Sequence, residues 1–486
     1  MKRLRVWVRK MIPISWSSNL LSTEQLDNIH AVAVELAETV GLLVDHTVLL
    51  SRLAGQEGVR IEGKRARFRS DRIEAALGAM RFPPSPTPDK FAIISGAYII
   101  SVQDIETGKI RAATQQDLID LMRLGQQLGL RGSPPVRPLD LPEPLQEIAM
   151  YKAAWEYSER RPEPLFDTTP MSTVQSAEVI YEMAQAIGKP FAVGMYLISP
   201  FTCPREGLEV IAAFLERQVP MWVGTMPIAG LSAPIFMLGA HVQALAELMA
   251  GIALLHALAG DDADIYWTPI DSVRAHPFDM RYASFVYGSP EDVLGTFLQA
   301  QINQRYGVPL VAKSLLTTAR EPDEQAAAEK CAHTLAAALA GARIFTNAGF
   351  LAVDEYVSPA QTVIDHEIVQ YVRRVIEGLS IDAETMAIEA IRDVSLGDKS
   401  FLKHETTLQH FRDVNWDPTL FTHVGLKSSQ NERTPSLWKR ARSMAKQYIA
   451  AADYVLPEPD RLVLDQIYRR AEREFAHKSL DELKGA

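Results

Sequence analysis

The stretch at residues 221–269, MWVGTMPIAGLSAPIFMLGAHVQALAELMAGIALLHALAGDDADIYWTP, contains the pattern that decides the fold. Two short and mainly apolar runs, 221–225 and 264–268, predict strands. Between them lies a long apolar helix, for which Pro234 suits the first position and Gly260 the residue just after the last. Two strands joined by such a helix are typical of a βαβ unit, whose strands run parallel.

The same alternation continues on both sides of this stretch. We expect further strands at 132–136, 165–168, 191–197, 310–314 and 343–346, and helices at 172–187, 205–217, 290–306 and 323–340. This series predicts an α/β fold with a (β/α)8 TIM-barrel core at residues 131–360. Residues 1–130 would add a helical and β-hairpin region packed on the barrel, and residues 361–486 a C-terminal helical extension.

An open doubly wound sheet is the alternative to a barrel. Such a sheet usually carries a glycine-rich phosphate-binding turn after its first strand. Neither GxGxxG nor GxxxxGK[ST] occurs in the chain, which favours the barrel.

The helix of the opening stretch is long enough to imitate a membrane span. Four polar side chains interrupt it, namely His241, Gln243, Glu247 and His256. Because polar and charged groups are costly in a single span, we predict a buried helix and no membrane association.

Composition limits the classes of function. The chain has 486 residues, a formal net charge of −10 and no prominent basic stripe, so we expect no nucleic-acid partner. The two cysteines, Cys203 and Cys331, cannot form a four-cysteine zinc site, and we expect no metal. HETTLQH at 404–410 lacks the HExxH spacing of a metalloprotease. No secretory signal follows the basic start, so the protein is expected in the cytoplasm.

A barrel places its site where strands end and loops begin. The candidates at these positions are Tyr196, Trp222, Trp267, His276, Lys313, Phe345 and Asn347. Aromatic rings outnumber carboxylates here, and ring faces attract a quaternary ammonium by cation–π interaction. Trp267 is the first candidate, because a large ring at a strand end usually faces the barrel mouth. Two alternatives stay open: the rings can be barrel packing, and Lys313 can pair with a neighbouring acid rather than bind a substrate carboxylate.

Several ordered motifs resemble one known family. DIETGKIRAATQQDL at 104–118 is similar to a motif of the trimethylamine methyltransferase family, and HFRDVNWDPTLF at 410–421 is similar to its closing signature. Between them, DMRYASFVYGSPEDVL (279–294) and AALAGARIFTNAGFL (337–351) follow in the order of the family.

The resemblance implies a barrel enzyme that moves a methyl group from a small methylated amine to the cobalt of a partner corrinoid protein in one-carbon metabolism. The corrinoid would belong to the partner, so the chain itself would bind no cofactor. Because only standard residues occur, the chain resembles the non-pyrrolysine branch, whose members include glycine betaine:corrinoid methyltransferases. A homo-oligomer is also expected. No catalytic residue is assigned.

The chain departs from the family pattern at two strand ends. Lys313, Ser314 and Leu315 replace a region that is usually small, and DIYWTP at 264–269 is bulkier than the usual turn. Two further hypotheses therefore stay open: a non-catalytic barrel that binds a methylated amine, and a methyltransferase with a different methyl donor.

Overall fold

A computed structural model describes residues 11–12, 20–80, 82, 90–96, 98–160, 171–397, 400–423, 435–475 and 477–484. The strand expected at 165–168 lies outside these residues.

Two parallel three-stranded sheets form the centre of the molecule. One has the order β10–β9–β8 and the other β13–β14–β5. Their strands are β8 (Val193–Leu197), β9 (Met221–Thr225), β10 (Ile265–Trp267), β13 (Val311–Ala312), β14 (Ile344–Thr346) and β5 (Ala92–Ile94). Ile265 lies opposite Met221 in a parallel register, which confirms the pairing expected from the opening stretch.

β5 precedes residue 131, where the core was expected to begin, yet it pairs with β14 along its whole length. An isolated parallel bridge from Ile94 to Arg131 continues this sheet by one more segment. The parallel core therefore begins earlier in the chain than the sequence predicts. The apolar residues of 91–114 predict strands and turns, but no long helix separates β5 from the strands that follow it, so the sequence assigns it to the β-hairpin region rather than to the parallel core.

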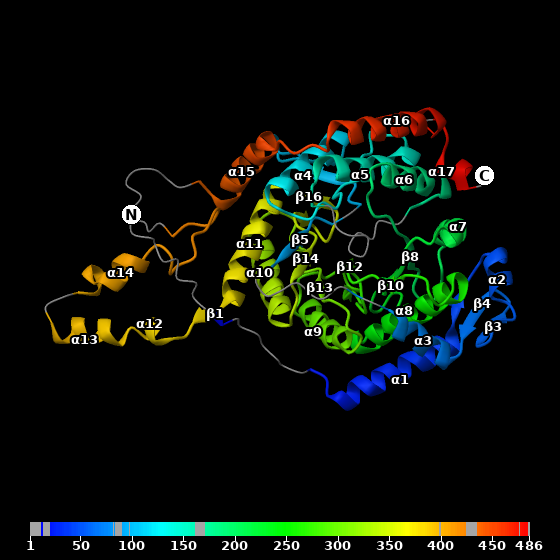
Figure 1. Cartoon of the computed structure of the whole chain (residues 1–486), viewed down its shortest axis with the longest axis horizontal. Coiled ribbons are helices and arrows are strands. Elements are labelled where there is room, and N and C mark those ends of the chain that lie inside the picture. The colour runs from blue at the N-terminus through cyan, green and yellow to red at the C-terminus, as the bar shows by residue number, and fades with distance from the viewer. Residues whose placement is uncertain are drawn as a thin grey trace.

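Helices surround the strands as a ring (Figure 1). They are α4 (Gln115–Gln127), α5 (Glu143–Tyr157), α6 (Val174–Ala186), α7 (Arg205–Phe214) with the 3-10 turn η2 (Leu215–Arg217), α8 (Met237–Ala259), α9 (Pro290–Arg305), α10 (Glu324–Leu339) and α11 (Pro359–Glu377). From β8 to α11, each core strand is followed by one of these helices, which confirms the predicted strand–helix alternation.

Successive side chains of a strand point to opposite sides of the sheet. Trp222, Tyr266, Val311 and Ile344 belong to one apolar cluster, to which β5 also contributes, so strands of both sheets face a shared interior. The alternate residues of β9 and β10 pack instead in the large cluster formed with the surrounding helices.

Among the described residues, the hydrogen-bonded ladder does not continue from β10 to β13, so two sheets are present rather than one closed barrel. Prolines at both places limit the ladder. Pro269 follows β10 and Pro309 precedes β13, and proline has no backbone N–H to donate.

α8 begins at Met237 rather than at the expected Pro234, and Gly260 ends it as predicted. Before the helix, residues 228–233 form a tight turn in which the backbone N–H of Ile228 donates to the Ser232 hydroxyl at 2.9 Å. Of the described helices, α8 alone is apolar and long enough to cross a membrane. In its most apolar window 89% of the residues are buried inside the protein, as expected for a core helix.

The N-terminal region packs below α8. It comprises α1 (Thr23–Val40), α2 (Thr47–Leu53), α3 (Ser70–Ala79) and an antiparallel sheet of β2 (Leu42–Leu43), β4 (Arg65–Phe68) and β3 (Val59–Glu62). A second mixed sheet has the order β15 (Phe350–Leu351), β16 (Tyr356–Val357), β6 (Ser101–Gln103), β7 (Ile110–Ala112). The hairpin β11 (Phe278–Asp279) and β12 (Ser284–Phe285) lies in the segment after β10.

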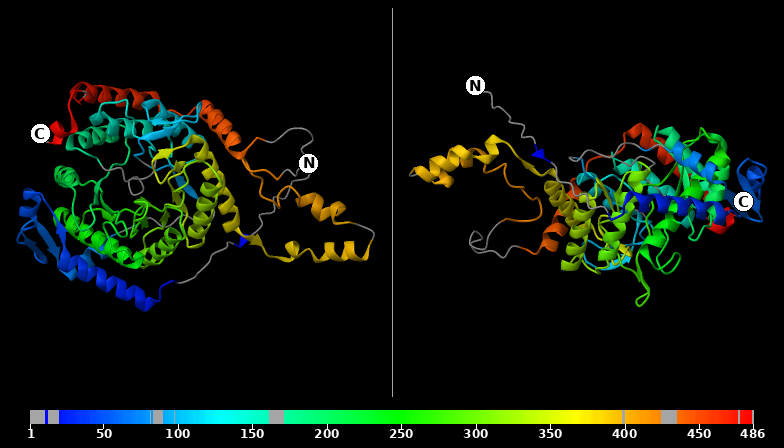
Figure 2. Two further views of the ribbon diagram at one scale, coloured as in Figure 1. Left: turned by 180° about the vertical axis from the view of Figure 1, so that it is seen from behind. Right: turned by 90° about the horizontal axis from the view of Figure 1, so that it is seen from below.

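The C-terminal part divides into helices on the body and a projecting segment. α15 (Leu437–Ala451), α16 (Glu458–Phe475) and α17 (Leu480–Lys484) lie along the body. The projecting segment, called the arm below, comprises residues 379–397 and 400–419 and extends beyond α11 (Figures 1 and 2). It contains β17 (Leu379–Ser380), paired with β1 (Met11–Ile12), then α12 (Ala383–Met386), α13 (Ile388–Leu396), η3 (Phe401–Lys403) and α14 (Glu405–His410).

Candidate functional site

A buried carboxylate joins side chains from three core strands and their loops. The Tyr196 hydroxyl donates a hydrogen bond to Oδ2 of Asp271 at 3.0 Å. Nζ of Lys313 lies 2.6 Å from Oδ1 of the same carboxylate. Nε2 of His276 lies 3.8 Å from that Oδ1. We call these four residues the Asp271 cluster. Three of them, Tyr196, His276 and Lys313, are predicted site residues, and the structure brings them together around an acid that sequence reasoning missed.

The strands explain why these side chains meet. Tyr196 packs on the interior cluster that contains Val311, and Lys313 stands two places after Val311 on the same chain path. Residues two apart along extended chain share a face, so Lys313 follows Val311 toward the interior. Asp271 comes four residues after the end of β10. All three positions lie at the carboxyl ends of parallel strands, where loops of an α/β fold form binding sites.

The loop that carries Asp271 and His276 is tied down on two sides. The Ser272 hydroxyl donates to Oδ1 of Asn303 at 2.8 Å, which anchors the loop to α9. The backbone N–H of His276 donates to the carbonyl of Pro227 at 2.9 Å, which anchors it to the loop after β9. The cluster is therefore held by a rigid support.

A second buried ion pair lies beside this loop. Nη2 of Arg274 donates to Oδ1 of Asp292 at 2.5 Å, and both side chains are fully buried. His333 lies 3.6 Å from the other oxygen of Asp292 and contacts the Thr296 hydroxyl at 2.8 Å. This group links the loop to α9 and α10 and accounts for the burial of so many polar side chains.

The Asp271 cluster has little net charge, because the ammonium of Lys313 pairs with the carboxylate of Asp271. The pairing of Lys313 with Asp271 is the alternative that the sequence left open for this lysine. Burial, with Lys313 and Arg274 nearby, holds the pKa of His276 well below its usual value, so the imidazole is neutral. Neither of its ring nitrogens has a hydrogen-bond partner among the described residues. Lys313 keeps 11% of its side chain exposed and Tyr196 is also only partly buried, so solvent can reach the cluster at these two residues.

Aromatic rings line the interior next to the cluster. The Tyr196 and Trp222 rings meet edge to face with centroids 5.3 Å apart. Tyr266 belongs to the same interior cluster as Trp222. Two glycines make room for these rings. A Cβ on Gly194 would come 2.2 Å from the Trp222 ring, and one on Gly224 would come 2.5 Å from the Tyr196 ring.

Trp267 and Phe345 lie on the other side of the sheets. Trp267 packs in the helix-facing core, with its ring 5.3 Å from that of Tyr306, the residue that follows α9. Phe345 packs against Phe91 at 5.1 Å, in a cluster that contains residues of α10 and α11. The expected orientation of Trp267 toward the mouth is therefore wrong. A shift of one residue along a strand reverses the face, and the inward ring of β10 is Tyr266.

Asn347 occupies a junction between strands rather than the cluster. Its backbone is left-handed, with φ of 71°, and its N–H donates to the carbonyl of Ile94 at 3.1 Å. Its side-chain oxygen accepts a hydrogen bond from the Thr346 hydroxyl at 2.6 Å. Asn347 thus shapes the turn after β14.

Exposed apolar side chains surround the loops at this end of the strands. They are Ile198, Leu231, Ile235, Phe236, Met280 and Tyr282, and we call them the rim. A cleft of about 570 Å³ runs between the loop after β9 and the β11–β12 hairpin, where Ile235 and Met280 line it. Within the described residues, no three histidine, cysteine or acidic side chains gather closely enough to hold a metal ion.

Comparison with known proteins places the chain among methyltransferases. A family model described as trimethylamine methyltransferase (MTTB) matches residues 5–476. A glycine betaine methyltransferase of Desulfitobacterium hafniense is 24% identical over 470 residues, covering 91% of this chain and 94% of that protein. Trimethylamine methyltransferase MttB of Methanosarcina thermophila is 32% identical over 220 residues, and this match spans 44% of each protein.

A solved structure, the monomethylamine methyltransferase MtmB of Methanosarcina barkeri, covers 90% of this chain and 88% of that chain with a TM-score of 0.48 and 12% identity. The match of the family model over nearly all of the sequence is decisive for the assignment. The chain belongs to the trimethylamine methyltransferase family.

Proposed function

We propose that the chain removes a methyl group from a small quaternary or otherwise methylated amine of the betaine type, and passes it to the corrinoid of a partner protein. One observation carries the proposal: Tyr196, whose ring packs edge to face on Trp222 and lies against the interior cluster that also holds Tyr266, reaches the Asp271 cluster through its hydroxyl. Rings bind the diffuse charge of a methylated ammonium, and the cluster offers one group of each sign beside them.

The chemistry needs positioning more than acid–base catalysis. When a methyl group leaves a quaternary nitrogen, the C–N electron pair stays on nitrogen and a neutral tertiary amine departs. No proton has to be supplied. The partner's reduced corrinoid would provide the nucleophile, and this chain would hold the cation, direct one methyl group outward and exclude water. The neutral His276 fits this task, because it adds no positive charge that would repel the ammonium.

Lys313 and Asp271 would divide the recognition of a betaine. A betaine carries a carboxylate and an ammonium, which match the ammonium of Lys313 and the carboxylate of Asp271. The existing pair at 2.6 Å would open to admit the zwitterion between its members. Choline has no carboxylate, so it would gain nothing from Lys313.

We infer a (β/α)8 barrel as the scaffold, with additional regions at both ends of the chain. Three observations support it: the first strand, β5, pairs with the last, β14; strands of both sheets share one interior; and helices surround them.

The rim is the proposed approach for the corrinoid protein. Its apolar side chains stand at the carboxyl ends of the strands, and an acceptor on a partner protein has to enter from this end. Phe236 and Tyr282, which are 79% and 77% exposed, are its most exposed members, and groups of exposed apolar side chains mark interaction sites. This role fits a cytoplasmic enzyme.

Calorimetry with glycine betaine and choline tests the binding site. Tyr196→Leu should weaken both ligands about ten-fold, since one cation–π contact contributes roughly 1–2 kcal/mol. Tyr196→Phe keeps the ring and should lose less. Tyr306→Leu removes a ring on the helix side and serves as the matched control.

Lys313→Met should weaken betaine but not choline, because it frees Asp271 for an ammonium. Equal affinities in parent and variants would refute the site.

Methyl transfer needs a separate measurement. The full chain is mixed with betaine and reduced free cobalamin, and the absorbance of the corrin is followed. Transfer above the rate without the protein supports the enzyme. Betaine binding with no transfer, either to cobalamin or to a purified corrinoid protein, would support the non-catalytic alternative.

A further inference from the structure

We propose that the arm is a dimerisation element, whose apolar surface is covered by the arm of a second copy of this chain. The proposal does not depend on the substrate, and only the choice of a second copy over a corrinoid protein rests on the proposed function.

The arm lacks a core of its own. Across its described residues, α12, η3 and α14 contain no buried residue, and α13 contains only Ala390, which is 7% exposed. Helices as short as these are not stable in water without packing of an apolar face. The conformation of the arm therefore requires a surface that the described residues of this chain do not provide.

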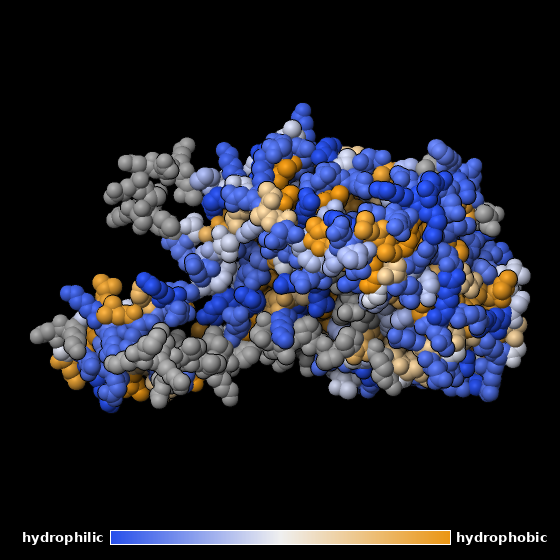
Figure 3. All heavy atoms as spheres, turned by 45° about the horizontal axis from the view of Figure 1, so that its top comes forward, coloured by the Kyte–Doolittle hydropathy of each residue, from blue (hydrophilic) through white to orange (hydrophobic). Residues whose placement is uncertain are grey.

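Large apolar side chains are concentrated on the arm. It holds eleven of the twenty-eight exposed large hydrophobic residues in the described chain: Leu379, Ile381, Met386, Ile388, Ile391, Leu396, Phe401, Leu402, Leu408, Phe411 and Val414. Leu396 and Leu402 are 88% and 78% exposed. Figure 3 shows apolar groups on this projecting lobe. A charged surface segment would not show this composition.

Both ends of the arm are fixed to the body. At its start, the arm continues directly from α11, and its first strand, β17, pairs with β1. At its end, the buried carboxylate of Glu367 on α11 accepts hydrogen bonds from the backbone N–H groups of Leu420 and Phe421, at 2.8 and 3.0 Å. The Trp416 ring also packs edge to face on Tyr371 of α11, at 5.7 Å. Both ends of the arm are thus attached to α11, while the apolar side chains between them are exposed and available to a partner.

The exposed apolar area suits a stable protein interface. A fully buried Leu, Ile, Val, Met or Phe side chain removes roughly 60–120 Å² of apolar surface from water, so eleven of them at the observed exposures offer on the order of 400–800 Å². A standard interface buries about 800 Å² on each partner. The apolar side chains of the arm thus supply about half or more of such an interface.

A second copy fits the arm better than a corrinoid protein does. The arm lies beside α11, outside the ring of helices (Figure 1), whereas a methyl acceptor has to approach the ends of the strands inside that ring. A two-fold axis would also cover two arms with one contact, since each copy contributes the same surface.

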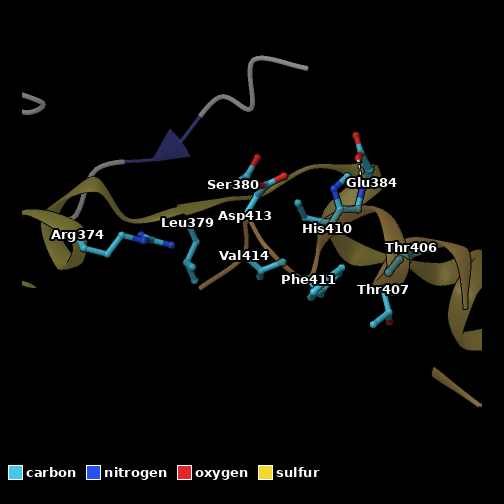
Figure 4. A pocket seen from close by; sticks show the side chains of 12 residues that line it. Arg374, Leu379, Ser380, Glu384, Thr406, Thr407, His410, Phe411, Asp413 and Val414 are labelled. Carbon is cyan, nitrogen blue, oxygen red and sulfur yellow. Dashed lines mark ion pairs between the residues drawn. The ribbon is translucent and has the colours of Figure 1, made fainter. Parts of the chain in front are cut away.

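The arm has a cavity that can receive the partner's side chains. It measures about 510 Å³ and lies between the β17–α12 segment and α14 (Figure 4). Leu379, Phe411 and Val414 form apolar walls, and Nε2 of His410 lies 3.4 Å from Oε1 of Glu384 at the edge. The exposed Leu396 or Leu402 of a second arm has the size and polarity to enter it.

Sedimentation of the full chain tests the proposal. The parent should sediment at micromolar concentration as a dimer, or as an assembly of dimers, of the 54.0 kDa chain. Leu396→Glu combined with Leu402→Glu should weaken the association at least ten-fold. Both side chains are exposed, so the monomer should keep its circular dichroism. Val48→Glu changes a 69% exposed valine on α2 and serves as the matched control.

Amide hydrogen exchange gives a second readout that needs no variant. Exchange in α13 and α14 should slow as the protein concentration rises, while α2 stays unchanged. A parent that is monomeric at all concentrations would overturn the proposal. So would an assembly that the double variant leaves intact, or arm exchange that does not depend on concentration.

Discussion

Single residues determine how the rings pack in the interior, and Gly224 is the clearest example because it leaves space for the Tyr196 ring. A Cβ at this position would lie 2.5 Å from the Tyr196 ring and 2.8 Å from a methyl carbon of Thr268. Gly224→Ala should therefore displace the ring, break the hydrogen bond from Tyr196 to Asp271 and cost roughly 1–3 kcal/mol of unfolding free energy. Urea unfolding measures the cost. Gly78→Ala on α3, where a Cβ would meet nothing within 4 Å, is the control. Equal stabilities of the two variants would contradict the packing described.

The same scale shows what a sequence can reveal of a site. Lys313 was predicted because it stands at a strand end, and its ion pair was one of two readings. Asp271 was missed because a single loop acid has no periodicity to mark it. Its distance of four residues from the end of β10 was the available signal. The sequence did not indicate Gly194 and Gly224 for another reason. The register of strand pairing decides which ring lies over each glycine, and the sequence of one strand does not show that register.

At the scale of one element, the two aromatic residues of β10 have different roles: Trp267 packs in the helix-facing core, and Tyr266 faces the proposed binding site. Trp267→Ala should destabilise the fold by about 3–5 kcal/mol, as for other large buried rings, because it empties a site in the helix-facing core. It should leave the affinity of the folded protein for betaine unchanged. Tyr266→Leu should do the opposite, with a small loss of stability and a clear loss of affinity. Unfolding and calorimetry on both variants measure the contrast. Loss of affinity in Trp267→Ala alone would reverse the assignment of faces.

The strands were predictable at this scale, but their faces were not. The core strands are apolar on both sides, because one side meets the interior and the other the helices. Such strands lack the alternation of polar and apolar residues that reveals a face. Trp222 and Trp267 therefore look equivalent in the sequence, although their rings lie on opposite sides of one sheet. Capping patterns were more informative: Ser22 with Gln25 begins α1 as the spacing indicates.

For the whole molecule, buried histidines predict acid sensitivity. Burial lowers the pKa of His241, His333 and His366 to about 4, whereas in the unfolded chain they titrate near the ordinary value of 6.5. The unfolded state therefore binds more protons as the pH falls from about 6.5 toward 4, and stability decreases over this window. Above pH 6.5 the contribution is fully present.

Urea unfolding between pH 7.5 and 4.5 measures this effect. Each buried histidine should contribute a slope of up to about 1.4 kcal/mol per pH unit. His333→Gln can keep the contact with Thr296 and should remove one histidine's share of the slope. A stability that stays constant from pH 7 to pH 5 would show that these imidazoles are not buried in solution.

Whole-molecule features were also the hardest to foresee. The alternation of strands and helices predicts the parallel core, yet the arm was expected only as part of a helical extension. Its short helices follow ordinary periodicity, and nothing local in the sequence says that they lack a core. That property depends on how the arm is anchored to α11, where Glu367 holds the backbone of Leu420 from 53 positions away in the chain.

The pairing of β5 with β14 has a consequence for biosynthesis. Ala92 and its partner Ile344 stand 252 positions apart, so β5 leaves the ribosome long before its neighbour exists. At about 5–20 residues per second, the delay is on the order of 10–50 s. During this time one edge of β5 exposes unpaired N–H and C=O groups next to apolar side chains, a template for aggregation. Nascent chains of this protein should therefore depend on chaperones until residue 346 has been translated, and a circular permutant that begins at β14 should depend on them less.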